Sequence, residues 1–171
     1  MKKVVITGGL GYIGTELCKI YSGYSWNDKI TIIDNRFISE RVNQIRNWNM
    51  NFVQGDILDK EILKKYCHDA DVVHHLAGIT DVPRVKSESL EKKNELISRV
   101  AEEGTQNILD VINNKCKIIM PSSHVVFEGI ENVRMNIKED EKVNPVLSYG
   151  KSKATNEVQL KKSGKKYIIL R

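Results

Sequence analysis

The sequence predicts an α/β fold, a doubly wound parallel sheet, and two observations carry this prediction. Short apolar runs alternate along the chain with longer runs in which apolar residues recur at helical spacing. The short runs are continuously apolar, which is typical of parallel strands buried on both faces. A chain of 171 residues with 40% hydrophobic content supports one compact core and leaves little room for a second. We therefore expect a single domain over residues 1–171.

The first half of the chain begins with a strand, a helix and a second strand. β-branched residues fill 4–6 and 29–34, which are expected as strands, and helical spacing predicts a helix at about 14–24 between them. The unit recurs as an apolar strand at 51–54 and an amphipathic helix at about 60–66.

The second half repeats the same alternation. An apolar strand at 71–76 is followed by a long amphipathic helix at about 90–113 and by a strand at 117–120. A further helix at about 149–162 leads to a last apolar strand at 167–170.

With right-handed crossovers, these elements give a Rossmann fold. The one irregular stretch, residues 127–147, is expected as a loop over the carboxyl edge of the sheet. Ligands bind at that edge in this architecture.

A glycine-rich turn follows the first strand and opens the first helix. Gly8 permits the tight turn, Gly11 lets a pyrophosphate approach the backbone, and Gly14 permits close packing of the helix. The N-terminus of the helix that follows supplies N–H groups and a partial positive charge for phosphates. We expect a dinucleotide here, with a bare structural turn as the alternative.

An acidic residue closes the second strand at the distance a dinucleotide site requires. Asp34 stands about 20 residues after Gly14, where a carboxylate accepts hydrogen bonds from an adenosine ribose and repels a 2′-phosphate. NAD is therefore expected over NADP. Arg36 either pairs with a phosphate or lays its stem over the adenine. Asp56, after the third strand, either meets the adenine amino group or caps the following turn.

Three residues in the second half form a candidate catalytic set. Tyr149 and Lys153 share one helix face because they stand four residues apart, and an ammonium near a phenol favours phenolate. We expect this charge, with that of the cofactor, to lower the pKa of Tyr149 towards working pH. Tyr149 is then the general acid or base, Ser123 hydrogen-bonds the same substrate oxygen, and Lys153 also holds the nicotinamide ribose.

Together these motifs resemble the extended short-chain dehydrogenase/reductases, in particular the NAD-dependent nucleotide-sugar epimerase/dehydratase family. Residues 7–14 resemble its TGxxGxxG turn, 75–78 its HxAG strand end, 104–107 its GTxN segment, 121–127 its SSxxVYG segment and 148–153 its YGxSK segment. The resemblance implies tightly held NAD and a transient oxidation of a sugar carbon. The cofactor-binding residues it implies are Gly8, Gly11, Tyr12, Ile13, Gly14, Asp34, Asn35, Arg36, Asp56, Ile57, Leu76, Ala77, Gly78, Tyr149 and Lys153.

Three departures from the family pattern refine the expectation. Ala101 stands where the family usually has Asn, so one polar contact near the active site is absent. Ser122, Ser123 and His124 replace the Thr-Asp-Glu triplet of dehydratases, which favours an epimerase or a simple oxidoreductase. The residues that would build a substrate-binding lobe do not follow Arg171, so that lobe is expected to be missing or truncated. A non-catalytic NAD-binding module, or the cofactor-binding fragment of a longer enzyme, is therefore the alternative to a nucleotide-sugar epimerase.

Composition and single-residue patterns exclude several other classes. The net charge of +5 comes from scattered lysines and a solvated helix end, which does not indicate nucleic-acid binding. No apolar run approaches the ~20 residues of a membrane span, and no signal peptide is evident, so a cytoplasmic protein is expected. Cys18, Cys67 and Cys116 have no ligand spacing, and are expected as buried free thiols without a metal.

The remaining expectations concern histidines and self-association. His68 and His74 are expected to be structural or exposed, while His124 either faces the substrate or packs beneath the loop, the latter being favoured. The family implies a homodimer through the two long helices. Five apolar positions of the first of them cannot all face one sheet, so some are expected to be available to a partner, with core burial as the alternative: Leu96, Val100, Ile108, Leu109 and Ile112.

Overall fold

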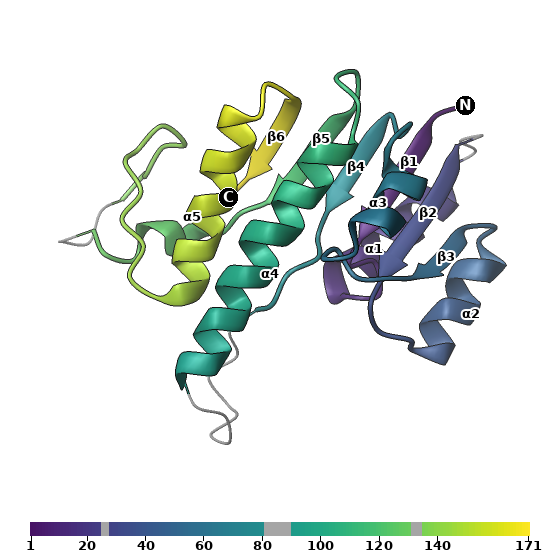
Figure 1. The fold of residues 1–171 in the computed structure, drawn as a ribbon, viewed down its shortest axis with the longest axis horizontal. Helices are drawn as coiled ribbons and strands as arrows, with labels where there is room; N and C mark the ends of the chain where they lie inside the picture. The colour runs from purple at the N-terminus through teal and green to yellow at the C-terminus, as the bar shows by residue number, and fades with distance from the viewer. Residues whose placement is uncertain (25–27, 81–89, 131–134) are drawn as a thin grey trace.

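The computed structural model describes residues 1–24, 28–80, 90–130 and 135–171. Its centre is a six-stranded sheet with the order β3-β2-β1-β4-β5-β6, in which every recorded pairing is parallel (Figure 1). This is the strand order of the dinucleotide-binding doubly wound fold. The strands are β1 (Lys3–Thr7), β2 (Lys29–Asp34), β3 (Asn51–Gln54), β4 (Val72–His75), β5 (Lys117–Pro121) and β6 (Lys166–Leu170).

Helices cover both faces of the sheet, as the sequence predicts. They are α1 (Tyr12–Gly23), α2 (Ser39–Asn47), α3 (Lys60–Cys67), α4 (Leu90–Val111), the 3-10 turn η1 (His124–Phe127) and α5 (Ser148–Lys162). Two buried hydrophobic clusters show which helices pack against each face of the sheet. Val5, Ile33 and Val73 point to the face covered by α3, α4 and α5, and the neighbouring Val4 and Ile32 point to the face covered by α1 and α2.

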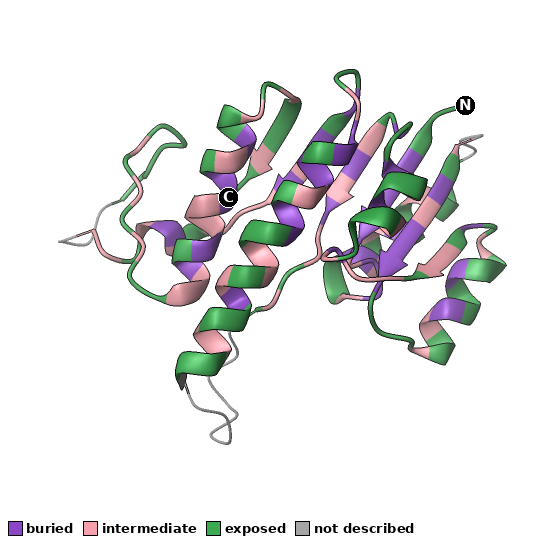
Figure 2. Ribbon diagram, in the orientation of Figure 1, coloured by how far each residue is buried: buried purple, intermediate pink, exposed green. Residues whose placement is uncertain are grey.

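Burial follows the three layers, with buried residues concentrated along the central strands and on the helix faces that meet them (Figure 2). The edge strand β6 is less covered, since Tyr167, Ile168 and Leu170 are all exposed. Cys18, Cys67 and Cys116 are free and buried, as expected, and burial raises the pKa of the first two thiols to about 12. Desolvation of a thiolate is the main cause. None of the helices in the described ranges has the length and apolar character that a bilayer crossing needs.

The structure departs from the predicted elements mainly at one helix. Helix α2 was not predicted, because only Val42 and Ile45 in it are buried and its N-cap residue Ile38 makes no side-chain cap bond. The ends of the other elements differ from the predicted ones by two residues or fewer. The irregular stretch at 127–147 is confirmed over the part that the structure describes, whereas 131–134 lie outside it.

Candidate functional site

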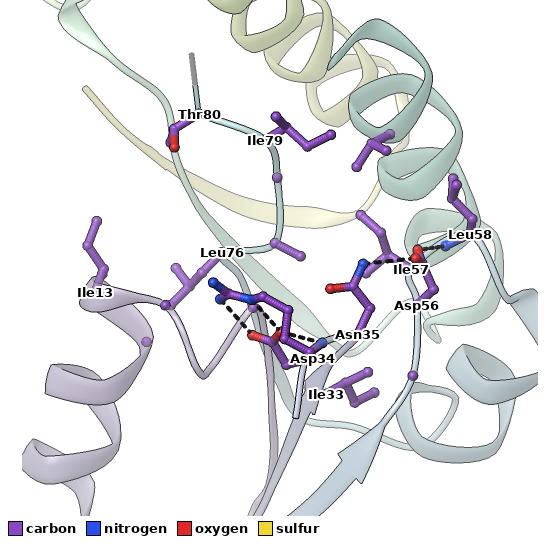
Figure 3. Close-up of a pocket in the computed structure, with 18 of the residues that line it drawn as sticks. Ile13, Ile33, Asp34, Asn35, Asp56, Ile57, Leu58, Leu76, Ile79 and Thr80 are labelled. Carbon is purple, nitrogen blue, oxygen red and sulfur yellow. Dashed lines mark hydrogen bonds and ion pairs between the residues drawn. The ribbon is translucent and has the colours of Figure 1, made fainter. Parts of the chain in front are cut away.

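A cavity of about 680 Å³ opens at the carboxyl ends of the central strands (Figure 3). The glycine turn after β1, the end of β2 and the segment after β4 border it. It brings together the predicted cofactor residues outside the catalytic set: Gly8, Gly11, Tyr12, Ile13, Gly14, Asp34, Asn35, Arg36, Asp56, Ile57, Leu76, Ala77 and Gly78. Residues that were not predicted to hold the cofactor complete the wall: Ile33, Gly55, Leu58, Ile79, Thr80, Leu96, Val100 and Pro121.

The glycine turn has a shape that side chains would destroy. Gly8 has a φ of +70°, and a Cβ built on it would lie 2.6 Å from the backbone N of Ala77. A Cβ on Gly14 would lie 2.5 Å from the Cα of Gly9. The backbone of the turn therefore rests directly on the end of β4, and the first turn of α1 rests on the glycine turn. An uncrowded helix N-terminus facing a hollow is the arrangement that accepts phosphates.

The end of β2 carries an ion pair between the buried Asp34 carboxylate and the exposed Arg36 guanidinium rather than a free carboxylate. Asp34 is buried, and its Oδ2 accepts a hydrogen bond from the Leu10 N–H at 3.0 Å. Its Oδ1 accepts from the backbone N–H of Arg36 at 3.0 Å and from Nε of Arg36 at 3.2 Å. The guanidinium pairs with Asp34, and its two predicted placements, against a phosphate or with its stem over an adenine, stay predictions. A carboxylate held at this edge still fits a ribose, since each oxygen retains acceptor capacity.

In the turn after β3, Asp56 takes the capping role that was predicted as one of its two alternatives. Its Oδ1 accepts a hydrogen bond from the Leu58 N–H at 2.9 Å, and its Oδ2 accepts from Nδ2 of Asn35 at 3.0 Å (Figure 3). Asp56 therefore caps the turn and ties the ends of β2 and β3 together. It also lines the cavity, so capping and contact with a ligand are compatible.

The candidate catalytic residues stand beside the cavity at the ends of β5 and the start of α5. Nζ of Lys153 donates to the Pro121 carbonyl oxygen at 3.0 Å and lies 5.8 Å from the ring centroid of Tyr149. Oγ of Ser123 accepts the Val125 N–H at 3.4 Å, which caps η1. Pro121 also lines the cavity, so one backbone carbonyl joins the two parts of the predicted site.

The expected lowering of the Tyr149 pKa is not seen in the chain alone. Burial raises the pKa of the Tyr149 phenol and lowers that of the Lys153 ammonium. Both shifts have the same physical cause, because removal from water disfavours the charged form of each group. The ammonium is directed to the Pro121 carbonyl, and desolvation is the cause of the raised Tyr149 pKa.

The buried carboxylate of Glu157, which the sequence analysis did not predict, binds one of the two neighbouring serines and not the other. Oε1 of Glu157 accepts a hydrogen bond from Oγ of Ser122 at 2.6 Å, and from Nε of Arg171 at 2.9 Å. Oε2 accepts from Nη2 of Arg171 at 2.5 Å and from Nζ of Lys161 at 3.4 Å. Burial works to raise the pKa of Glu157, but the bonds from Arg171 and Ser122 hold it below its usual value. Ser122 is thus committed to the fold, which leaves Ser123 for a ligand.

The four histidines take different positions. His75 is buried, with Nδ1 3.0 Å from Oγ1 of Thr7 and Nε2 3.0 Å from Oγ1 of Thr105. Burial, with a smaller effect of the Lys153 ammonium, lowers the pKa of His75 to about 3. The prediction that His74 and His68 are structural or exposed is confirmed. His74 Nε2 meets the Tyr21 hydroxyl at 2.8 Å, and the exposed His68 has its Nδ1 3.2 Å from the Val111 carbonyl oxygen. The favoured burial of His124 is wrong, since it is exposed on η1.

Ala101, the departure from the family pattern, lies where α4 faces α5. Its carbonyl oxygen accepts a hydrogen bond from Nδ2 of the buried Asn156 at 2.8 Å. A polar bond therefore links the two helices at this position, although the expected asparagine is absent. Within the described residues, no group of three or more His, Cys, Asp or Glu is placed to hold a metal ion.

A comparison with known families matches residues 5–168 to the 3-beta hydroxysteroid dehydrogenase/isomerase family. The chain belongs to this family. The match confirms that the chain belongs to the extended short-chain dehydrogenase/reductases, as the sequence predicted. Its relatives include nucleotide-sugar epimerases and dehydratases. The dTDP-D-glucose 4,6-dehydratase of Dictyostelium discoideum is 29% identical over an alignment 175 positions long, which covers 92% of the chain and 39% of the dehydratase.

Two solved epimerases share the fold of this family member. The UDP-N-acetylglucosamine 4-epimerase of Methanobrevibacter ruminantium M1 has a TM-score of 0.78 at 32% identity, covering 99% of the chain and 54% of the epimerase. The UDP-glucose 4-epimerase of Brucella ovis, solved with NAD, has a TM-score of 0.79 at 29% identity, covering 100% and 51%. The chain therefore spans about half the length of each epimerase. NAD, predicted from the sequence, is confirmed as the cofactor of such relatives.

Proposed function

We propose that residues 1–171 form an NAD-binding domain that supplies the acid/base machinery of an epimerase-like oxidoreductase acting on a nucleotide-sugar. The observation that carries the proposal is the shared position of Pro121, which lines the cavity and accepts the hydrogen bond from Lys153. The predicted cofactor site and the predicted proton-transfer residues are therefore neighbours. The nucleotide-sugar relatives support the substrate class.

In this proposal the chain's own residues hold the cofactor and move one proton. The glycine turn and the start of α1 hold the pyrophosphate, and Asp34 holds the adenosine ribose. NAD supplies the acceptor for a hydride when it is bound. Tyr149 takes the proton of a sugar hydroxyl as that carbon is oxidised and returns it later, while Ser123 hydrogen-bonds the same oxygen. Lys153 stabilises the phenolate.

The test is turnover of a panel of UDP-, dTDP- and GDP-sugars with saturating NAD, with NAD binding measured in the same sample. We expect product from the wild type, and loss of product in Tyr149→Phe with NAD affinity unchanged within a few fold. The matched control is Tyr167→Phe, which removes an exposed hydroxyl on β6. Retained turnover in Tyr149→Phe would remove Tyr149 from the mechanism.

A non-catalytic NAD-binding module is the second candidate. It is favoured by the pKa of Tyr149, which burial raises rather than lowers. This candidate predicts NAD binding without turnover of any sugar nucleotide in the panel. Bound NAD without product would select it, or would place the rest of the site in sequence beyond these residues.

We further propose a homodimer formed through α4 and α5. Much of the apolar surplus expected on α4 is in the core, because Ile108, Leu109 and Ile112 are buried. Val158 on α5 is exposed and supports the proposal, whereas the exposed Leu96 on α4 lines the cavity. Sedimentation should give the mass of a dimer, and Val158→Lys should give a monomer. A wild-type monomer would refute this interface.

A cytoplasmic location is proposed on the state of the cysteines. Cys18, Cys67 and Cys116 are all free thiols, and a reducing compartment preserves such thiols. Fractionation of cells that produce the protein would test this, and recovery from a secreted fraction would contradict it.

A further inference from the structure

The helix that carries Tyr149 and Lys153 begins without a cap of its own. The N-cap residue of α5 is Leu147, which makes no side-chain cap bond. Yet the first N–H groups of a helix need acceptors, and a helix start without them frays. Tyr149 is the second residue of α5, so fraying there would move the phenol directly.

Another element supplies an acceptor for the residues that lead into the helix, Val146 and the N-cap residue Leu147. Oε1 of Glu128, which follows η1, accepts a hydrogen bond from the Val146 N–H at 2.7 Å and from the Leu147 N–H at 2.5 Å. A carboxylate at this end of a helix also opposes the positive end of the helix dipole. Glu128 is exposed, so its carboxylate is not needed to fill the core.

Close packing makes this contact sensitive to position. A Cβ on Gly150 would lie 2.9 Å from the Val125 carbonyl oxygen and 3.0 Å from Oε1 of Glu128. The first turn of α5 therefore lies directly against η1. Ser123 caps η1 through its own Oγ, so η1 connects the predicted serine to the start of the predicted tyrosine helix.

A second set of bonds closes the same junction. The backbone N–H of Asn144 donates to the Val126 carbonyl at 2.8 Å, and its Nδ2 donates to the Gly129 carbonyl at 2.6 Å. The Gly129 N–H donates in return to the Asn144 carbonyl at 2.8 Å. The segment before α5 is thus fixed to η1 on both sides of Glu128.

We propose that Glu128 is a positioning residue that sets the start of α5 and so holds Tyr149 in register with Ser123. It acts through the backbone of residues 146 and 147 and touches neither substrate nor cofactor. The inference deepens the proposed function and rests on it, because it assigns Glu128 a role in the same acid/base pair.

The test compares Glu128→Ala with Glu128→Gln, whose amide oxygen still accepts both N–H groups. The matched control is Asp140→Ala, which removes an exposed carboxylate from the loop before α5. A displacement of about 1 Å at a reacting group costs on the order of 100-fold in rate. We expect kcat of Glu128→Ala to fall by at least about tenfold with the NAD Kd within about twofold, and Glu128→Gln and Asp140→Ala to retain wild-type kcat.

A readout that does not need turnover separates this inference from the proposed function. The resonance of the Tyr149 ring carbon, assigned by its loss in Tyr149→Phe, is recorded in tyrosine-labelled protein with NAD. It should shift in Glu128→Ala and stay in place in Glu128→Gln and Asp140→Ala.

Two results would overturn the role of Glu128. One is an unshifted Tyr149 resonance in Glu128→Ala, even with a lowered melting temperature, since that would make the contact merely structural. The other is wild-type kcat in Glu128→Ala. Absence of turnover in the wild type would count against the proposed function alone, because the resonance would still decide the role of Glu128.

Discussion

The buried imidazole of His75 makes stability depend on pH in a range where few other groups titrate. Its pKa is lowered to about 3 in the folded chain, against about 6.5 in an unfolded one. A group with a depressed folded pKa stabilises the fold above the unfolded pKa, and that stability is lost as pH falls towards the folded pKa. Acidification below about pH 6.5 should therefore destabilise the chain through His75.

The magnitude follows from the two pKa values. Between about pH 7.5 and about pH 5.5 the unfolded imidazole binds most of a proton and the folded one almost none, which costs about 1.4 kcal/mol. Any folded pKa below about 4.5 gives nearly the same figure, so the estimate does not depend on the exact depth of the shift. His74 adds to the loss, since burial also lowers its pKa.

The assay is urea unfolding of the wild type and His75→Gln at both pH values. The variant should be less stable at the higher pH, because it disturbs the bonds to Thr7 and Thr105, but its loss on acidification should be about 1.4 kcal/mol smaller than that of the wild type. An equal pH dependence in His75→Gln and the wild type would refute the reasoning.

Three further predictions concern other parts of the structure. Glu157→Gln should lower the free energy of unfolding in urea by about 3–5 kcal/mol, because the Arg171 side chain, only 13% exposed, loses its countercharge. Lys161→Ala should cost under about 1 kcal/mol, because the Lys161 side chain is 50% exposed, and equal costs for the two variants would contradict this. Gly8→Ala should lose about 1–2 kcal/mol from its positive φ alone and abolish NAD binding measured by calorimetry, and retained binding would remove the turn from the site. Asp34→Asn should shift the ratio of NADP to NAD affinity by roughly tenfold towards NADP, or about 1.4 kcal/mol, and an unchanged ratio would exclude Asp34 as the discriminating charge.

The sheet and the cofactor wall were predictable because their signals are local. Strands buried on both faces are continuously apolar, and Gly8 and Gly14 lie in one short segment between a strand and a helix. Helix α2 was not predicted, since two buried residues give too weak a period to recognise. Its position depends on the sheet it packs against.

The supporting contacts of the site could not be predicted, because they join residues far apart in sequence. His75 meets Thr7 across 68 positions, and Ser122 meets Glu157 across 35. The sequence predicted that Tyr149 and Lys153 share a helix face, but not that the pKa of Tyr149 is raised above its ordinary value. That direction depends on how much water the folded chain removes from the phenol.

The strand order has a consequence for how the chain folds during synthesis. β1 lies at the centre of the sheet and pairs with β2 on one side and with β4 on the other, where Val4 meets Val72. Once residues up to 54 have left the ribosome, β1, β2 and β3 are available to pair, but the other edge of β1 stays open until residues 72–75 emerge. An open strand edge presents unpaired backbone N–H and C=O groups, which pair with other nascent chains. The interval between these two segments is therefore when a nascent chain of this design depends most on a chaperone.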